Sequence, residues 1–189
     1  MTSLLAIDLA PRFSAAILRA ESGRWYSIVS PYDSSPERFV RKVRDAWGVP
    51  DVLLVEDVPP GMKNTSVMKA QYQMQGRVLE AFDPYAQGPE HVPIYLIRPH
   101  TWQKAMGVSD GRKSLNTKPY KEASQETAGE RGWTAPFDYT EYHGKERQER
   151  RKSCGDSADA YLLSEWGLGT DLTHFEKFLY HPSAGPPHL

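Results

Sequence analysis

Hydrophobic residues recur along the chain at two spacings, one typical of strands and one typical of helices. Residues 3–10, 13–20 and 24–32 are apolar or alternate between apolar and polar positions, and short polar turns separate them. This pattern predicts three strands joined by tight hairpins. A nearly continuous apolar run at 51–58 predicts a strand buried on both faces, and 92–99 predicts a fifth strand.

Helical spacing appears between and after these strands. A helix is predicted over 35–48, with Ser35 as its cap, Pro36 at its first position and Gly48 as its end. A second helix, 65–82, has an apolar stripe of Met68, Tyr72, Leu79 and Phe82. Further helices are predicted at 101–107, near 118–131 and from 153 to 169.

The order of these elements indicates the class of fold. Antiparallel strands come first, and strands then alternate with helices, which favours an α/β fold with a mixed five-stranded sheet and helices on both faces. We predict one domain over residues 1–170 and a flexible tail over 171–189. The charged segment that follows residue 131, up to Lys152, is predicted to be a mobile loop.

Composition agrees with one globular domain. The chain has 189 residues, of which 39% are hydrophobic and 25% charged, enough to bury a core. The single cysteine, Cys154, excludes an internal disulfide framework and fits a reducing compartment. The N-terminus lacks a basic leader and has only a short apolar run, so we expect no signal peptide, no membrane span and a cytoplasmic location.

Positive charge is concentrated in one region. Between Arg98 and Lys152 there are 12 lysines and arginines and 8 acidic residues, a balance of +4, and the rest of the chain carries −5. This region either meets a polyanion or is an ordinary solvated surface of mixed charge.

Four acidic residues stand where apolar residues are expected. Asp8 lies inside the first strand, and Glu56 lies at the end of the strand at 51–58. If these strands lie parallel and adjacent, Asp8 and Glu56 share one sheet face and Asp57 points to the other. In the last helix, Asp156 and Asp159 share a face with the apolar residues Leu163 and Trp166.

Buried carboxylates need compensation, because burial and mutual repulsion both oppose their charge. A divalent metal removes both costs, and a set of carboxylates without positioned His or Cys favours Mg²⁺ or Mn²⁺. Two such ions would support phosphodiester hydrolysis. Simpler interpretations remain for single residues: Ser153 and Asp156 fit a helix-capping pattern, Glu56 could end its strand in solvent, and Asp8 could pair with a lysine.

Five segments, in this order and spacing, resemble the RuvC family of Holliday-junction resolvases, which have the RNase H-like fold, and especially its bacteriophage members. The segments are "LLAIDLA", "VLLVED", "QYQMQGRVLEAF", "IRPHTWQKAMG" and "GDSADAYLL", and the resemblance covers Met1 to about Gly169.

The resemblance implies a DNA endonuclease that cuts near branch points, leaving 5′-phosphate and 3′-hydroxyl ends, with a role in DNA recombination or repair. Asp8, Glu56, Asp156 and Asp159 would be the ligands of two Mg²⁺ or Mn²⁺ ions. In some members of the family, a histidine occupies the position that matches Asp156. The resemblance also implies a homodimer that makes paired cuts, since a four-way junction presents two related strands.

The resemblance further assigns Lys104 and Lys118 to positions near the scissile phosphate, with two solvated lysines as the alternative. It also assigns Gly76 to a close approach of its helix to the sheet. The run "KERQERRK" at 145–152 would track phosphates, or be a solvated charge run. The expected DNA-binding residues are Lys104, Arg112, Lys113, Lys145, Arg147, Arg150, Arg151 and Lys152.

One departure widens the expected substrates. Some bacterial members have an aromatic wedge three residues after the catalytic glutamate, where this chain has Pro59, with Met62 as a possible replacement. We therefore expect forks and flaps as substrates besides junctions. Three alternatives stay open: a nuclease for RNA–DNA hybrids, a branched-DNA binding protein without turnover, and a sugar-kinase-like fold, for which the chain is short and lacks a glycine-rich phosphate loop.

Overall fold

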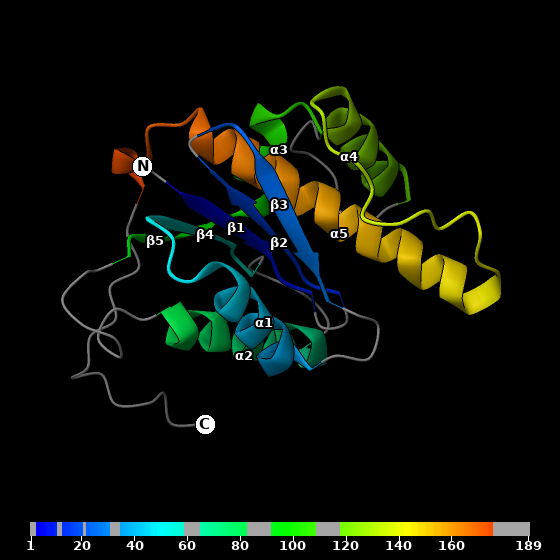
Figure 1. Ribbon diagram of the computed structural model, residues 1–189, viewed down its shortest axis with the longest axis horizontal. Coiled ribbons are helices and arrows are strands. Elements are labelled where there is room, and N and C mark those ends of the chain that lie inside the picture. The colour runs from blue at the N-terminus through cyan, green and yellow to red at the C-terminus, as the bar shows by residue number, and fades with distance from the viewer. Residues whose placement is uncertain are drawn as a thin grey trace.

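Five strands and five α-helices form the protein in the computed structural model, which describes residues 3–10, 13–20, 22–30, 35–58, 65–82, 92–108 and 118–175 (Figure 1). The strands are β1 (Leu4–Asp8), β2 (Ala15–Arg19), β3 (Trp25–Val29), β4 (Val52–Glu56) and β5 (Ile94–Ile97). The helices are α1 (Pro36–Trp47), α2 (Thr65–Phe82), α3 (Pro99–Ala105), α4 (Lys118–Glu130) and α5 (Gly144–Leu168).

The strands form one mixed sheet in the order β3-β2-β1-β4-β5. β2 pairs antiparallel with both β1 and β3, whereas β1, β4 and β5 run parallel to one another. In the parallel pair, Ile7 of β1 lies opposite Val55 of β4. The predicted hairpins and mixed sheet are therefore confirmed, and Asp8 and Glu56 end adjacent parallel strands at the same edge.

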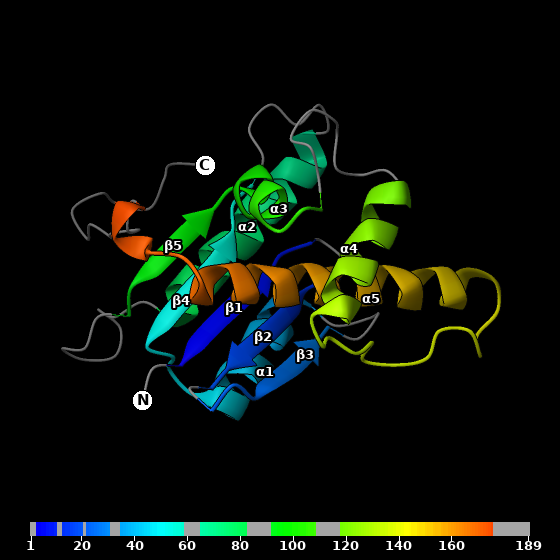
Figure 2. The same cartoon turned by 90° about the horizontal axis from the view of Figure 1, so that it is seen from above.

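Helices cover both faces of the sheet, as predicted. α1 and α2 lie on one face, and α5 crosses the other face at an angle to the strands (Figures 1 and 2). Leu5 and Leu53 pack with α1 and α2, while Leu4 and Leu54 pack with α5. Because side chains alternate along a strand, Asp8 and Glu56 belong to the α5 face.

The neighbour of Glu56, Asp57, belongs to the other face. Its carboxylate accepts a hydrogen bond of 3.3 Å from Gln75 of α2, which covers that face. The predicted separation of Glu56 and Asp57 is thus observed.

The charged run at 145–152 is helical, so the prediction of a mobile loop there is wrong. α5 begins at Gly144, well before residue 153, and its first part extends past the sheet (Figures 1 and 2). This extension has no apolar stripe among its described residues, and polar contacts stabilise it instead. Arg150 pairs with Glu146 and lies 3.8 Å from the centre of the Tyr142 ring, and Arg151 pairs with Glu122 of α4.

This longer helix also excludes the capping role of Asp156. Ser153 and Asp156 lie in the middle of α5, where the backbone N–H groups already bond within the helix. Asp156 therefore needs another explanation.

The buried face of α2 differs from the predicted stripe. Met74, Gln75, Val78 and Phe82 are buried, whereas Tyr72 is 48% exposed. Gly76 is exposed, and a Cβ built on it would meet nothing within 4 Å. The expected close approach of Gly76 to the sheet is therefore wrong, because its position on α2 faces away from the sheet.

Beyond α5, residues 171–175 continue past the predicted domain end. Leu172–His174 forms a 3₁₀ turn, and the ring of Phe175 lies 5.3 Å from that of Trp166. The rest of the predicted tail lies outside the described residues. Within the described part of the chain, no helix is both long and apolar enough to cross a membrane.

Gly167 lies where α5 packs closely on the sheet, and its position yields a stability prediction. A Cβ at this position would lie 2.3 Å from Cδ1 of Leu54 and 3.1 Å from Cδ1 of Leu4. We expect Gly167→Val to lower the free energy of unfolding by about 1–3 kcal/mol, through overpacking of the core. Urea denaturation measures this value. The matched control is Gly76→Val, which adds the same side chain in open space, and an equal loss in both variants would contradict the prediction.

Candidate metal centre

Three acidic side chains from two elements meet on the α5 face of the sheet. Asp8 ends β1, and Asp156 and Asp159 lie one turn apart on α5, the helix that crosses the sheet (Figure 2). One carboxylate oxygen from each residue lies within 4.8 Å of the other two. The residues are only 5%, 7% and 3% exposed, so their charges are largely removed from water.

The fourth predicted acid, Glu56, lies beside this group but outside the 4.8 Å cluster. It ends β4, next to β1, and is half-buried. Its Oε2 accepts a hydrogen bond of 3.2 Å from Nε1 of Trp102, a fully buried residue of α3. Glu56 therefore does not simply end its strand in solvent. Its negative charge helps to raise the pKa of Asp8, and the negative charge of Asp159 helps to raise the pKa of Glu56.

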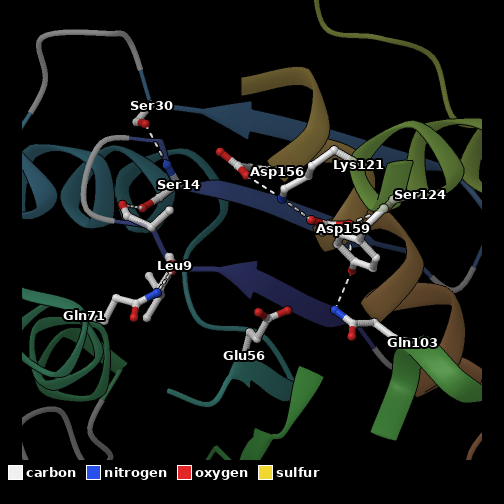
Figure 3. A network of polar contacts seen from close by, with 12 residues as sticks. Leu9, Ser14, Ser30, Glu56, Gln71, Gln103, Lys121, Ser124, Asp156 and Asp159 are labelled. Atoms are coloured by element: carbon white, nitrogen blue, oxygen red, sulfur yellow. Dashed lines mark hydrogen bonds and ion pairs between the residues drawn. The ribbon is translucent and has the colours of Figure 1, made fainter. Parts of the chain in front are cut away.

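A lysine that the sequence analysis missed joins the acids. Nζ of Lys121, on α4, lies 2.8 Å from Oδ1 of Asp156 and also donates to Oδ2 of Asp159 (Figure 3). Lys121 comes one helical turn after Lys118, the lysine chosen by resemblance. That spacing on a predicted helix was the available signal, since positions three residues apart share a face.

Hydroxyl groups of α4 hold Asp159 from its other side. Tyr120 donates to Oδ1 of Asp159 over 3.4 Å, and Ser124 donates to the same oxygen. Gln103 of α3 in turn donates to the Tyr120 oxygen (Figure 3). All these groups are buried. Trp102 and Gln103, consecutive in α3, therefore support Glu56 and Asp159 respectively.

Burial is the main cause of the pKa shifts at this site. It raises the pKa of Asp8 well above its usual value, with the negative charges of Glu56 and Asp156 adding to the effect. Burial raises the pKa of Glu56 to about 8, and that of Asp156 to about 6 against the opposing charge of Lys121. For Lys121, burial opposes the charge, but Asp159 and Asp156 outweigh it and raise its pKa.

The chemistry of these donors fits a hard divalent cation. Asp8, Asp156 and Asp159 offer carboxylate oxygens only, and Glu56 adds a fourth carboxylate nearby. Oxygen donors of this kind suit Mg²⁺ or Mn²⁺ better than Zn²⁺. Among the described residues, Lys121 forms ion pairs with Asp156 and Asp159, and its positive charge also opposes the rise in the pKa of Asp8.

The predicted DNA-binding residues are placed as follows. Exposed side chains are those of Lys104 on α3 and Lys145, Arg147 and Lys152 on α5. Arg150 and Arg151 are half-buried and paired with acids. Lys118 begins α4, and its side chain is not among the described ones. Arg112, Lys113, Pro59 and Met62 lie outside the described residues. The roles of all these residues stay predictions.

Known structures share this arrangement of elements. A structure titled "T. thermophilus RuvC in complex with Holliday junction substrate" matches with a TM-score of 0.53 and 12% identity. A second, "Thermus thermophilus RuvC structure", matches with a TM-score of 0.55 and 15% identity. Each match covers 94% of this chain and 100% of the other. No family model and no curated protein matches the sequence. The chain therefore has a RuvC-like, RNase H-like fold, as predicted.

The raised pKa values predict how stability depends on pH without metal. Because the pKa values of Asp156, about 6, and Glu56, about 8, exceed those of unfolded carboxyls, the folded state holds protons that the unfolded chain has lost. The free energy of unfolding in EDTA should therefore fall as the pH rises from about 5 to about 8.

Urea denaturation at several pH values in this range checks the expectation. The control is the double variant Glu56→Gln, Asp156→Asn, in which these two groups cannot titrate, so its profile should be flatter. A wild-type stability that rises over the same range would contradict the assignment of raised pKa values.

Proposed function

We propose that the protein is a metal-dependent, structure-selective DNA endonuclease that resolves Holliday junctions and cuts other branched DNA. The observation that carries the proposal is the convergence of three buried carboxylates from β1 and α5 with the half-buried carboxylate that ends β4, at one edge of a RuvC-like sheet. Burying several negative charges together lowers stability unless a cation compensates them. A site of this kind that binds divalent metal can catalyse phosphodiester hydrolysis.

In this proposal Asp8, Glu56, Asp156 and Asp159 hold two Mg²⁺ or Mn²⁺ ions. When bound, such ions lower the pKa of a water molecule and neutralise charge on the leaving oxygen. The protein's own part is to fix the carboxylates. Strands β1 and β4 set the positions of Asp8 and Glu56, while Tyr120 and Ser124 orient Asp159. Water would attack the phosphorus atom and lose a proton, the bond from phosphorus to the 3′ oxygen would break, and the 3′ oxygen would take up a proton, which gives 5′-phosphate and 3′-hydroxyl ends.

The basic first part of α5 is proposed to hold the DNA backbone beside the scissile phosphate. Lys145 and Lys152 are seven residues apart on the helix, and Asp156 follows one turn later, so the three lie along one side of it. At a rise of about 1.5 Å per residue, Lys145 lies about 16 Å along the helix from Asp156, a span of several phosphates. Lys104 and Lys118 would contact the backbone nearer the cut.

A homodimer making paired cuts completes the proposal, because a four-way junction presents two strands related by symmetry. On the sequence resemblance we also propose a bacteriophage origin and action in the cytoplasm of a bacterial host, in DNA recombination or repair.

Cleavage of synthetic DNA tests the function. Wild type should cut an end-labelled four-way junction, and forks or flaps, in Mg²⁺ or Mn²⁺ and not in EDTA. Asp8→Asn and Asp159→Asn should each lose cleavage by at least about a hundredfold while still binding the junction, since less negative charge then faces the phosphates.

The matched control is Asp57→Asn, which removes a carboxylate adjacent to Glu56 but on the opposite sheet face, and it should cut normally. Full activity of either active-site variant would contradict the assignment. Preferred cleavage of an RNA–DNA hybrid would make the protein a hybrid nuclease instead, and tight junction binding without cleavage in any metal would make it a branched-DNA binding protein.

Salt dependence tests the proposed DNA contacts of α5. Each phosphate contact contributes about −0.9 to the slope of log affinity against log salt on duplex DNA. The triple variant Lys145→Ala, Arg147→Ala, Lys152→Ala should therefore reduce the magnitude of this slope by about 2–3. The control is Arg38→Ala, Arg41→Ala, Lys42→Ala, which removes three exposed charges from α1 on the other face of the sheet. Equal slopes for the two triple variants would contradict a specific role of α5.

A further inference from the structure

Lys121 contacts the same carboxylates that are proposed to bind metal. Its ammonium group bonds to Oδ1 of Asp156 and to Oδ2 of Asp159, while the other oxygen of Asp159 accepts from Tyr120 and Ser124. Both oxygens of Asp159 are thus engaged within the protein. A divalent cation at these carboxylates would share its ligands with a positive charge already in place.

The position of Lys121 is supported by the helix beneath it. Its side chain runs over Gly155 of α5, the residue before Asp156, and a Cβ on Gly155 would lie 3.1 Å from Cδ of Lys121. Glycine inside a helix costs about 1 kcal/mol relative to alanine. At position 155 the absence of a side chain leaves room for Lys121, so the glycine of α5 and the lysine of α4 fit against each other.

Mobility differs between the two partners of this contact. The side chain of Asp159 is held by hydrogen bonds from α4 and is 4% exposed, whereas that of Lys121 is 34% exposed and has a flexible four-carbon stem. Lys121 is therefore the partner that can move away. Two cations on the same carboxylate oxygens repel each other strongly in a site removed from water.

We propose that Lys121 is an internal counter-ion that competes with divalent cations for Asp156 and Asp159 and must withdraw from them when metal binds. The inference rests on the proposed metal site and adds how that site is regulated. Without metal, the ammonium group offsets the repulsion between the carboxylates. With metal, the same group lowers the affinity of the site.

Metal binding without DNA tests this inference independently of cleavage. Titration of Mn²⁺ into Lys121→Met, followed by calorimetry, should give a Kd at least about tenfold lower than in wild type. The rise in melting temperature caused by Mg²⁺ should also be larger. Lys121→Gln, a second neutral variant with a polar end, should show the same direction if Lys121→Met folds poorly.

Two controls separate the direct contact from general electrostatics. Lys152 is exposed and lies one turn from Asp156, and its positive charge also lowers the pKa of Asp156 without contacting it. Lys152→Met should therefore change the Kd for Mn²⁺ much less than Lys121→Met does. Adding Asp8→Asn to Lys121→Met should weaken binding again, which shows that the ion measured is at the acidic site.

Each outcome has a separate meaning. A Kd for Lys121→Met that is unchanged, higher or equal to that of Lys152→Met overturns the counter-ion role and leaves the proposed nuclease function standing. Absence of Mn²⁺ binding to wild type and to both Lys121 variants overturns the metal site itself, and with it both proposals.

Discussion

Repulsion between buried carboxylates is the constraint on which the rest of this structure depends. Asp8, Asp156 and Asp159 bring their oxygens within 4.8 Å of one another, and Glu56 adds its charge from the next strand. Such a group is stable only if protons, hydrogen bonds or cations offset its charge. The structure supplies hydrogen bonds from α3 and α4 and the ammonium group of Lys121, and the proposed function supplies divalent metal.

The fold holds close together the three elements that carry the acids, which are β1, β4 and α5. Parallel pairing of β1 and β4 places Asp8 and Glu56 side by side, and α5 packs on these strands so closely that a side chain at position 167 would displace Leu54. The apolar contacts of Leu4 and Leu54 with α5 thus fix the same helix that carries Asp156 and Asp159. Core packing and site geometry are consequently coupled, and a change in one moves the other.

α4 links the site to the basic extension of α5. One end of α4 contributes Tyr120, Lys121 and Ser124 to the acids, and Glu122 of the same helix pairs with Arg151. Ion pairs and the stacking of Arg150 on Tyr142 thus support the helical extension. A proposed phosphate contact on this helix has a fixed position relative to the carboxylates, which a mobile loop would not give.

The sequence by itself determined the strands, their pairing into a mixed sheet and the shared face of Asp8 and Glu56, because side-chain alternation and hydrophobic period are local properties that the chain order preserves. It also singled out the acids, since a carboxylate on an apolar face breaks the pattern. Only the tertiary structure decided that Lys121, Tyr120 and Ser124 meet Asp159, that Gly76 is exposed and that α5 begins at Gly144. The contacts to Asp159 join helices far apart in sequence, and the spacing of Lys118 and Lys121 marks a shared helix face without telling which groups that face meets. Gly76 is exposed because its position on α2 faces away from the sheet, and polar contacts of Arg150 and Arg151 hold the first part of α5 as a helix.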